Sequence, residues 1–256
     1  MKKVLVTLIA MGSLVSTFTF AGPINGTGFI IPDVIFGSGN ANGSFTGTTE
    51  NNVELGLRGK VRYNLLGVPE NTFNYDGNRT YTFDPASSNA PANRSVFNFE
   101  WSINSDVIGS GQTPLTSFFY QLDIDLDPTV GTNFLSFDPI NLDVADHAIG
   151  NNATGNGEGS VAGNETDYGN MISTSNVGQN SWNLGFFSPD GFDPQTEGMF
   201  TIGLSAFFAD GSLAASTDID IIYGNVPSSS VPEPASLALL ALSLVGLRFS
   251  RRKAKA

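Results

Sequence analysis

Apolar residues between positions 22 and 231 recur mostly at every second position, in short runs separated by clusters of Gly, Asn, Asp and Ser. A period of two is typical of β-strands that bury one face, and no long stripe with the 3.6-residue period of a helix is present. The pattern therefore predicts nine strands: Gly28–Phe36, Val53–Asn64, Thr80–Phe83, Ser95–Asn104, Thr116–Asp127, Asn133–Phe137, Ser181–Phe187, Gly198–Phe208 and Ser216–Tyr223.

Two of the clusters between strands have the composition of tight turns, Asn42-Gly43 and Asp76-Gly77-Asn78. Asn, Asp and Gly adopt the positive φ angles that hairpin turns require. Many short strands with regular turn signals predict an all-β fold, an antiparallel sandwich of jelly-roll type. The 20 Phe against two Trp indicate a core filled mainly by Phe.

The chain between the two ends reads as one β domain, residues 22–226. One stretch within it, residues 150–169, has almost no large apolar side chain and predicts a long, mobile surface loop. This loop could divide the body into two subdomains, but the strand patterns on its two sides are alike, and we favour one domain. Residues 227–230 then form a short linker to the C-terminal segment.

The N-terminus has the three parts of a secretory signal peptide. Lys2 and Lys3 precede an apolar run, and small residues occupy the positions before Gly22. This order predicts a leader over residues 1–21, cleaved between Ala21 and Gly22, and export through the general secretion machinery. The alternative is an N-terminal membrane anchor, which needs about 20 apolar residues and is disfavoured by Gly12 and the serines in the run.

The C-terminus carries a second apolar block, Ala235–Leu247. As a helix it would reach about 20 Å at about 1.5 Å per residue, short of the roughly 30 Å hydrocarbon core of a bilayer. Pro232 and Pro234 prevent the helix from continuing on one side. On the other side lies a basic tail that remains cytoplasmic by the positive-inside rule, consisting of Arg248, Arg251, Arg252, Lys253 and Lys255.

The sequence Val231-Pro232-Glu233-Pro234, the short apolar helix and the basic tail together resemble a PEP-CTERM sorting signal over residues 231–256. The resemblance implies an exported protein of a Gram-negative bacterium, held transiently in the inner membrane by this helix. It further implies recognition and removal of the tail by an exosortase, a membrane enzyme resembling cysteine transpeptidases. The family is associated with exopolysaccharide and biofilm, which implies a location at the cell surface or in the extracellular matrix. An ordinary tail anchor is the alternative.

Charge is distributed unevenly between the ends and the body. Two of the 12 basic residues lie in the leader and five in the tail, so the body has five basic residues and 23 acidic ones. Its net charge is therefore −18, compared with −12 for the whole chain. The five are Arg58, Lys60, Arg62, Arg79 and Arg94. Such a body repels nucleic-acid phosphates and attracts cations. The chain has no cysteine, which excludes thiol catalysis and cysteine-ligated metals.

Three aspartates alternate with apolar residues in one predicted strand: Asp123, Asp125 and Asp127. Carboxylates two residues apart lie about 7 Å from each other, so one Ca²⁺ would need ligands from other segments as well. A helix-flanked calcium loop does not fit, since its Gly and Glu positions hold Pro128 and Phe134. We favour a half-buried strand with a solvated acidic face and keep Ca²⁺ as a weak candidate; no other cofactor is indicated.

A second polar set follows, comprising Asp138, Asn141, Asp143, Asp146 and His147. Asp and Asn form turns as readily as they bind Ca²⁺, and turns are favoured here. His147 is the sole histidine and cannot form a multi-histidine zinc site. A Ser-His-Asp triad around it has no supporting Gly-x-Ser-x-Gly motif.

The two tryptophans, Trp101 and Trp182, are candidates for sugar-stacking platforms or for core packing. Phe97, Phe99 and Trp101 share one strand face, which favours the core. No catalytic motif is found, and we expect no enzyme. The sequence thus favours a structural or adhesive exported protein, with a carbohydrate-binding module, assisted by Ca²⁺ or not, as the alternative. A secreted glycan hydrolase or lyase is a third hypothesis, for which no acid pair can be nominated.

Overall fold

The computed structural model describes residues 22–225, apart from residues 130, 142–144 and 188–191. The predicted leader with Ala21, the linker and the whole sorting segment lie outside the described residues. Within the described ranges, no helix is long and apolar enough to cross a membrane.

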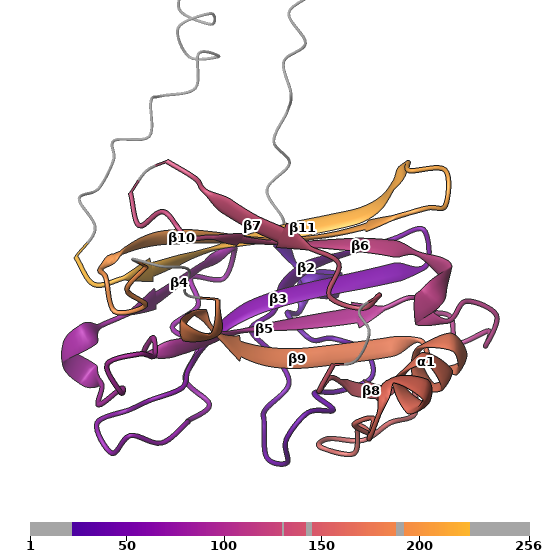
Figure 1. The fold of residues 1–256 in the computed structure, drawn as a ribbon, viewed down its shortest axis with the longest axis horizontal. Coiled ribbons are helices and arrows are strands. Elements are labelled where there is room, and N and C mark those ends of the chain that lie inside the picture. The colour runs from indigo at the N-terminus through magenta and orange to yellow at the C-terminus, as the bar shows by residue number, and fades with distance from the viewer. Residues whose placement is uncertain (1–21, 130, 142–144, 188–191, 226–256) are drawn as a thin grey trace, which may run out of the picture.

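Two β-sheets packed face to face form the body (Figure 1). The six-stranded sheet has the order β1 (Gly22–Pro23), β2 (Thr46–Glu50), β3 (Val53–Val61), β5 (Phe97–Asn104), β9 (Val177–Asn183) and β8 (Ala148–Gly150). The five-stranded sheet has the order β4 (Thr80–Phe83), β11 (Leu213–Tyr223), β10 (Gly198–Phe207), β6 (Phe119–Asp125) and β7 (Phe134–Phe137). All neighbours are antiparallel except β4 and β11, which run parallel. The predicted all-β sandwich is confirmed.

The core lies between the sheets and follows the predicted alternation. On β10, all residues at even positions are buried and all those at odd positions are partly exposed. The facing side of β5 contributes a run of fully buried large side chains: Phe97, Phe99, Trp101 and Ile103. Phe83 and Phe97 stack at 5.1 Å between ring centroids. Most of the buried core side chains are nevertheless Val, Leu, Ile and Ala, so the prediction of a core filled mainly by Phe is wrong, although aromatic rings form a prominent part of it.

The described residues include one α-helix, α1 (Glu165–Thr174), and four short 3₁₀ helices at Ile24–Gly26, Pro85–Ser87, Leu115–Ser117 and Leu184–Phe186. The side chain of Asn164 accepts a hydrogen bond from Asp167 N and caps α1. Tyr168 and Ile172 anchor the helix by burial. The prediction of a loop throughout 150–169 is therefore wrong from Glu165 onward.

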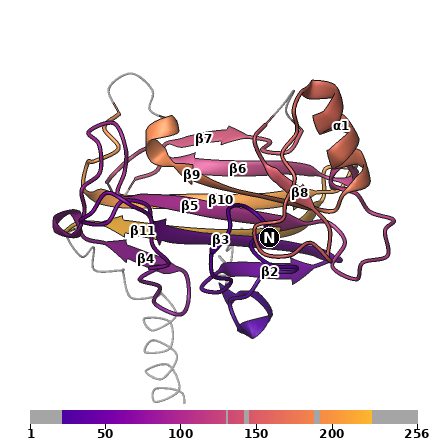
Figure 2. The same ribbon diagram turned by 90° about the horizontal axis from the view of Figure 1, so that it is seen from below.

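Residues 24–45, here called the N-terminal strap, cover the outer face of the six-stranded sheet. Figure 2 views the molecule from this side, with the strap in indigo and violet over β2 and β3. The predicted strand Gly28–Phe36 lies in this strap and forms no strand. Pro32 lacks the N–H that a ladder needs. The apolar residues of the strap instead form a small core of their own from Ile24, Ile30, Val34 and Phe45.

Two glycines make room for the strap. Gly47 and Gly56 are directly opposite each other on β2 and β3. A Cβ on Gly56 would lie 2.7 Å from Ile24 Cδ1 and 2.9 Å from Ile30 Cγ2. Because Gly47 and Gly56 have no side chains, the apolar residues of the strap can pack directly against the backbone of the sheet.

Other boundaries differ modestly from the predictions. The alternation did not reveal β2, whose residues are all polar or Gly, or β8, which has only three residues. Strand β9 begins at Val177 rather than Ser181, and its predicted end forms the 3₁₀ helix after Asn183. The turn at Asp76-Gly77-Asn78 is confirmed, since Tyr75 and Tyr81 form an antiparallel bridge around it.

Candidate functional site

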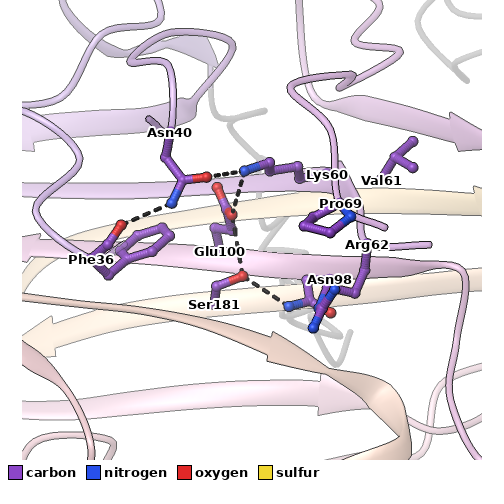
Figure 3. A pocket seen from close by; sticks show the side chains of 9 residues that line it. All are labelled: Phe36, Asn40, Lys60, Val61, Arg62, Pro69, Asn98, Glu100 and Ser181. Carbon is purple, nitrogen blue, oxygen red and sulfur yellow. Dashed lines mark hydrogen bonds and ion pairs between the residues drawn. The ribbon is translucent and has the colours of Figure 1, made fainter. Parts of the chain in front are cut away.

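A pocket of about 240 Å³ lies between the N-terminal strap and the outer face of the six-stranded sheet (Figure 3). The strap, β3 with the connection after it, β5 and β9 all contribute to its walls. Its lining comprises Phe36, Asn40, Lys60, Val61, Arg62, Pro69, Asn98, Glu100 and Ser181.

The pocket exists because the outer face of β5 is polar and yet covered. All eight residues of β5 are buried, including Asn98, Glu100, Ser102 and Asn104 on the face away from the core. Buried polar groups require hydrogen-bond partners. The strap supplies one of them, since Asn104 Nδ2 donates to Ile31 O at 3.0 Å. Neighbouring strands supply others, including Ser181 of β9 for both Asn98 and Glu100.

Glu100 is the only acid that lines the pocket, and it is neutralised by Arg58. Arg58 Nε and Nη2 lie 2.6 and 2.5 Å from Glu100 Oε2. Neither side chain is exposed by more than 1%. A buried ion pair of this kind is costly to disrupt, because the remaining charge would be left without a partner.

The guanidinium of Arg58 is also held by the strap. Its Nη1 donates hydrogen bonds to Ala41 O and Gly43 O at 2.8 and 2.7 Å. The rings of Phe45 and Phe73 lie on it at 4.1 and 4.3 Å from their centroids. Arg58 thus links the strap, β3 and β5, and it forms the back of the pocket rather than its lining.

Lys60 points into the pocket, where Nζ contacts the side chains of Asn40 and Glu100 (Figure 3). Asn40 Nδ2 donates to Phe36 O, which turns the amide oxygen toward Lys60. The distance from Nζ to Glu100 Oε1 is 3.8 Å, an ion pair but not a hydrogen bond. Burial lowers the pKa of Lys60, and the cation of Arg58 adds to this effect, while Glu100 opposes it.

Arg62 is the second cation, after Lys60, that lines the pocket. Its guanidinium lies 4.8 Å from the ring centroid of Tyr63 and makes no hydrogen bond or ion pair with any described side chain. The neighbouring acid Glu70 is engaged elsewhere, accepting a hydrogen bond from Asn64 Nδ2 at 3.0 Å. Arg62 is therefore available to a ligand.

Opposite the cations lies a polar floor. Asn98 Nδ2 donates to Ser181 Oγ at 2.9 Å, and Ser181 Oγ donates to Glu100 Oε1 at 3.2 Å. An amide nitrogen has two hydrogens, so Asn98 keeps one donor in reserve. Two cations, Lys60 and Arg62, thus line the pocket together with an acid that Arg58 neutralises and with hydroxyl and amide groups. This combination is suited to an anionic, hydroxyl-rich ligand.

A second buried acid lies beneath the strap, outside this pocket. Glu54 Oε1 accepts a hydrogen bond from Ile31 N at 2.7 Å, and Oε2 accepts one from Asn25 Nδ2 at 3.1 Å. Burial raises the pKa of Glu54 to about 7, although both hydrogen bonds oppose this shift. Glu54 is thus a titratable group that connects the strap to β3.

The three aspartates of the calcium hypothesis lie on β6 and in the turn after it. Asp125 Oδ1 accepts hydrogen bonds from Asp127 N and Asn133 N at 3.0 and 2.8 Å. Asp123 accepts from Gln121 Nε2 at 2.9 Å. Asp125 is only 1% exposed, so the predicted solvated acidic face is wrong at this residue. In the part of the chain that the structure describes, no group of three or more His, Cys, Asp or Glu is placed to hold a metal.

The beginning of the second polar set, Asp138 to Asn141, forms a turn, as favoured from the sequence. Asp138 Oδ1 accepts hydrogen bonds from Ile140 N and Asn141 N, both at 2.9 Å. Asp146 Oδ1 accepts one from Asn180 Nδ2 at 3.0 Å. Asp143 lies outside the described residues.

His147 is fully buried in an aromatic cluster. Its Nε2 lies 2.5 Å from Pro139 O and must donate there, so Nδ1 accepts from Asn180 Nδ2 at 3.0 Å. Burial lowers the pKa of His147, which keeps the ring neutral. Both nitrogens are occupied by structural bonds, so the geometry assigns this residue to packing.

The two tryptophans belong to the same cluster. Trp101 is fully buried and lies 4.8 Å from His147 and 5.4 Å from Trp182 between ring centroids. A fully buried indole cannot stack on a sugar, so the core-packing prediction is confirmed for Trp101. Trp182 is partly buried and packs against the same core.

Sequence reasoning did not find the pocket, although one signal pointed to it. Arg58, Lys60 and Arg62 are three of the five basic residues of the acidic body, and they occur at alternate positions. Alternate residues of a strand share a face. The concentration of cations on one face of β3 could therefore have been noticed, whereas the covering strap could not.

Residues 230–253 match the model of the PEP-CTERM protein-sorting motif. This confirms the resemblance drawn from the Pro-Glu-Pro sequence, the short apolar segment after it and the basic tail. The chain is therefore an exported protein of the class that exosortases sort to the cell surface. No curated protein and no solved structure matches the chain.

Proposed function

We propose that this protein is a non-enzymatic component of the cell surface or extracellular matrix of a Gram-negative bacterium, associated with exopolysaccharide. The observation that carries the proposal is the sorting motif at residues 230–253, at the end of a chain whose described residues form a β-sandwich. The leader 1–21 directs secretion, the apolar C-terminal segment pauses in the inner membrane, and the exosortase removes the tail. The sandwich then serves as a structural or adhesive unit.

The charge of the body supports an extracellular role. A net charge of −18 over residues 22–231 keeps such a domain soluble and attracts cations from the medium. The same charge disfavours contact with anionic lipid and nucleic acid.

Fractionation of the native host tests delivery. The full chain and a chain lacking residues 231–256 are compared in the inner membrane, periplasm, surface and medium. The proposal predicts that the full chain reaches the surface or medium, whereas the truncated chain accumulates in the periplasm. Equal distribution of the two chains would contradict it.

A second candidate function, carbohydrate binding, is favoured by the pocket beneath the strap. Its donors and its apolar wall at Phe36 are the groups with which proteins bind sugars. Hydrolysis would need a second carboxylate opposite Glu100, and no other described lining residue is an acid. Calorimetric titration with exopolysaccharide from the same host tests this function, and the absence of heat would leave the structural role alone.

A further inference from the structure

We infer that the pocket between the N-terminal strap and β3 binds a single acidic sugar, a uronate residue within a largely neutral polysaccharide. The inference rests on the second candidate function above and specifies its site and its ligand class. Lys60 and Arg62 take the carboxylate, Asn98 and Ser181 the hydroxyls, and Phe36 the apolar side of the ring.

The charge balance around the pocket is the first argument. The body has 23 acids and five bases, yet three of these bases lie close together, Arg58 and Lys60 on β3 and Arg62 directly after its last residue. Glu100 is the only acid among the lining residues, and its Oε2 is bound by Arg58. Lys60 and Arg62 therefore give the pocket a positive charge within a strongly negative domain.

The unused hydrogen-bond donors are the second argument. An ammonium group has three donors. Lys60 Nζ uses one on the amide of Asn40, and it lies too far from Glu100 Oε1, at 3.8 Å, for a second hydrogen bond. Arg62 makes no hydrogen bond or ion pair with the side chains that the structure describes. A carboxylate suits both, since its two oxygens accept charge-assisted hydrogen bonds from ammonium and guanidinium alike.

The size and the walls of the pocket are the third argument. About 240 Å³ is below the range of roughly 300–1,000 Å³ that holds drug-sized ligands, so a single small ring is the natural occupant. Phe36 forms an apolar wall on one side of the pocket and Pro69 adds an apolar side chain on the other, while Asn98 and Ser181 form the polar floor (Figure 3). A simple carboxylate would use only the cations, whereas a uronate uses the wall and the floor as well.

The charge of the whole domain restricts the ligand further. A dense polyanion would be repelled by the −18 body at every position beyond the pocket. An isolated uronate between neutral sugars avoids this repulsion and still brings one carboxylate to Lys60 and Arg62. Binding is expected to weaken as salt is added, because the attraction is between charges near the surface.

Calorimetric titration of the full chain in detergent solution tests the inference with three probes: sodium glucuronate, glucose and sodium acetate. Glucuronate is expected to bind at least tenfold more tightly than either of the others. The substitution Arg62→Gln is expected to weaken glucuronate binding at least tenfold. Arg94→Gln, which removes the same charge outside the pocket, is the matched control and is expected to leave the affinity within twofold.

Three results would overturn the inference: acetate or glucose binding as tightly as glucuronate, an unchanged affinity in Arg62→Gln, or no binding of glucuronate. Because Arg62 makes no hydrogen bond or ion pair with described side chains, its replacement leaves the fold intact, and loss of binding cannot be ascribed to unfolding. Binding of neutral oligosaccharides without glucuronate would refute the uronate site and leave carbohydrate binding standing. If neither the sugar probes nor the host exopolysaccharide bind, both the uronate site and the carbohydrate-binding function are refuted.

Discussion

Arg58 and Glu100 are directly opposite each other on β3 and β5, and Arg58 Nε donates a hydrogen bond of 2.6 Å to Glu100 Oε2. The pair lies on the face of the sheet that points away from the core, yet it is buried because the N-terminal strap covers it. The same pair fixes the strap through two backbone carbonyls and places the only lining acid of the pocket. The strap, the ion pair and the pocket are thus one structural unit.

The first prediction concerns this ion pair. Glu100→Gln is expected to lower the free energy of unfolding by about 3–5 kcal/mol, because the buried cation of Arg58 loses its counter-charge. Denaturant unfolding of the purified chain measures the change. Glu50→Gln, at an exposed acid of β2, is the control and is expected to change stability by less than about 0.5 kcal/mol. Equal effects of the two substitutions would show that the pair does not hold the strap.

The second prediction concerns the pH dependence of stability through Glu54. Its pKa is raised from 4.5 to about 7 in the fold, so between these values the folded protein retains a proton that the unfolded chain has released. The contribution of Glu54 is therefore fully present below about pH 4.5 and decreases as the pH rises through 7, by roughly 3 kcal/mol in total.

Glu54→Gln tests this directly, because the amide keeps an acceptor for Ile31 N and has no charge to bury. The variant is expected to be more stable than the native protein above pH 7, and the difference is expected to shrink or reverse at pH 4.5. The stability of both proteins is followed by denaturant unfolding across this range. A constant difference at all pH values would contradict the raised pKa.

The third prediction concerns His147. Because burial lowers its pKa and both ring nitrogens are bonded, the ring is expected to stay neutral in the folded protein as the pH passes through 6.5. Since it is the sole histidine of the chain, its imidazole signals in a nuclear magnetic resonance spectrum are unambiguous. The same signals should titrate near 6.5 in the urea-unfolded chain, and titration of the folded protein at that pH would refute the buried placement.

The fourth prediction concerns Trp101, whose indole nitrogen is buried with no hydrogen-bond partner among the described residues. Trp101→Ala is expected to cost about 3–5 kcal/mol, because it leaves a large cavity between the sheets. Trp101→Phe is expected to cost considerably less, since it keeps a ring beside His147 and removes the unpaired N–H. Equal losses in the two variants would mean that the nitrogen is bonded after all.

The alternation of apolar residues was enough to predict the sandwich, because most strands bury one face and leave the other polar. The alternation gave a wrong or missing prediction where a segment buries its apolar residues without forming a strand, and where a strand has few large apolar residues. The segment around Pro32 has the composition of a strand but packs as part of the strap. Strands β2 and β8 carry few large apolar residues and are held by their neighbours in the sheet.

The pocket was harder to predict for a physical reason. The outer face of β5 reads as an ordinary solvated face, with Asn98, Glu100 and Ser102 at alternate positions. Only the long-range contacts of the strap bury it, and one sequence does not reveal such contacts. The sorting motif, by contrast, could be identified from the sequence, because its parts follow one another within a short stretch of the chain and their order defines the motif.

The mass of the intact protein isolated from the surface or medium of its native host tests the central claim most directly. We expect a chain that begins at Gly22 and has lost the apolar segment and basic tail that follow the Pro-Glu-Pro sequence. A surface species that begins at Gly22 but still ends at Ala256 would contradict sorting by exosortase.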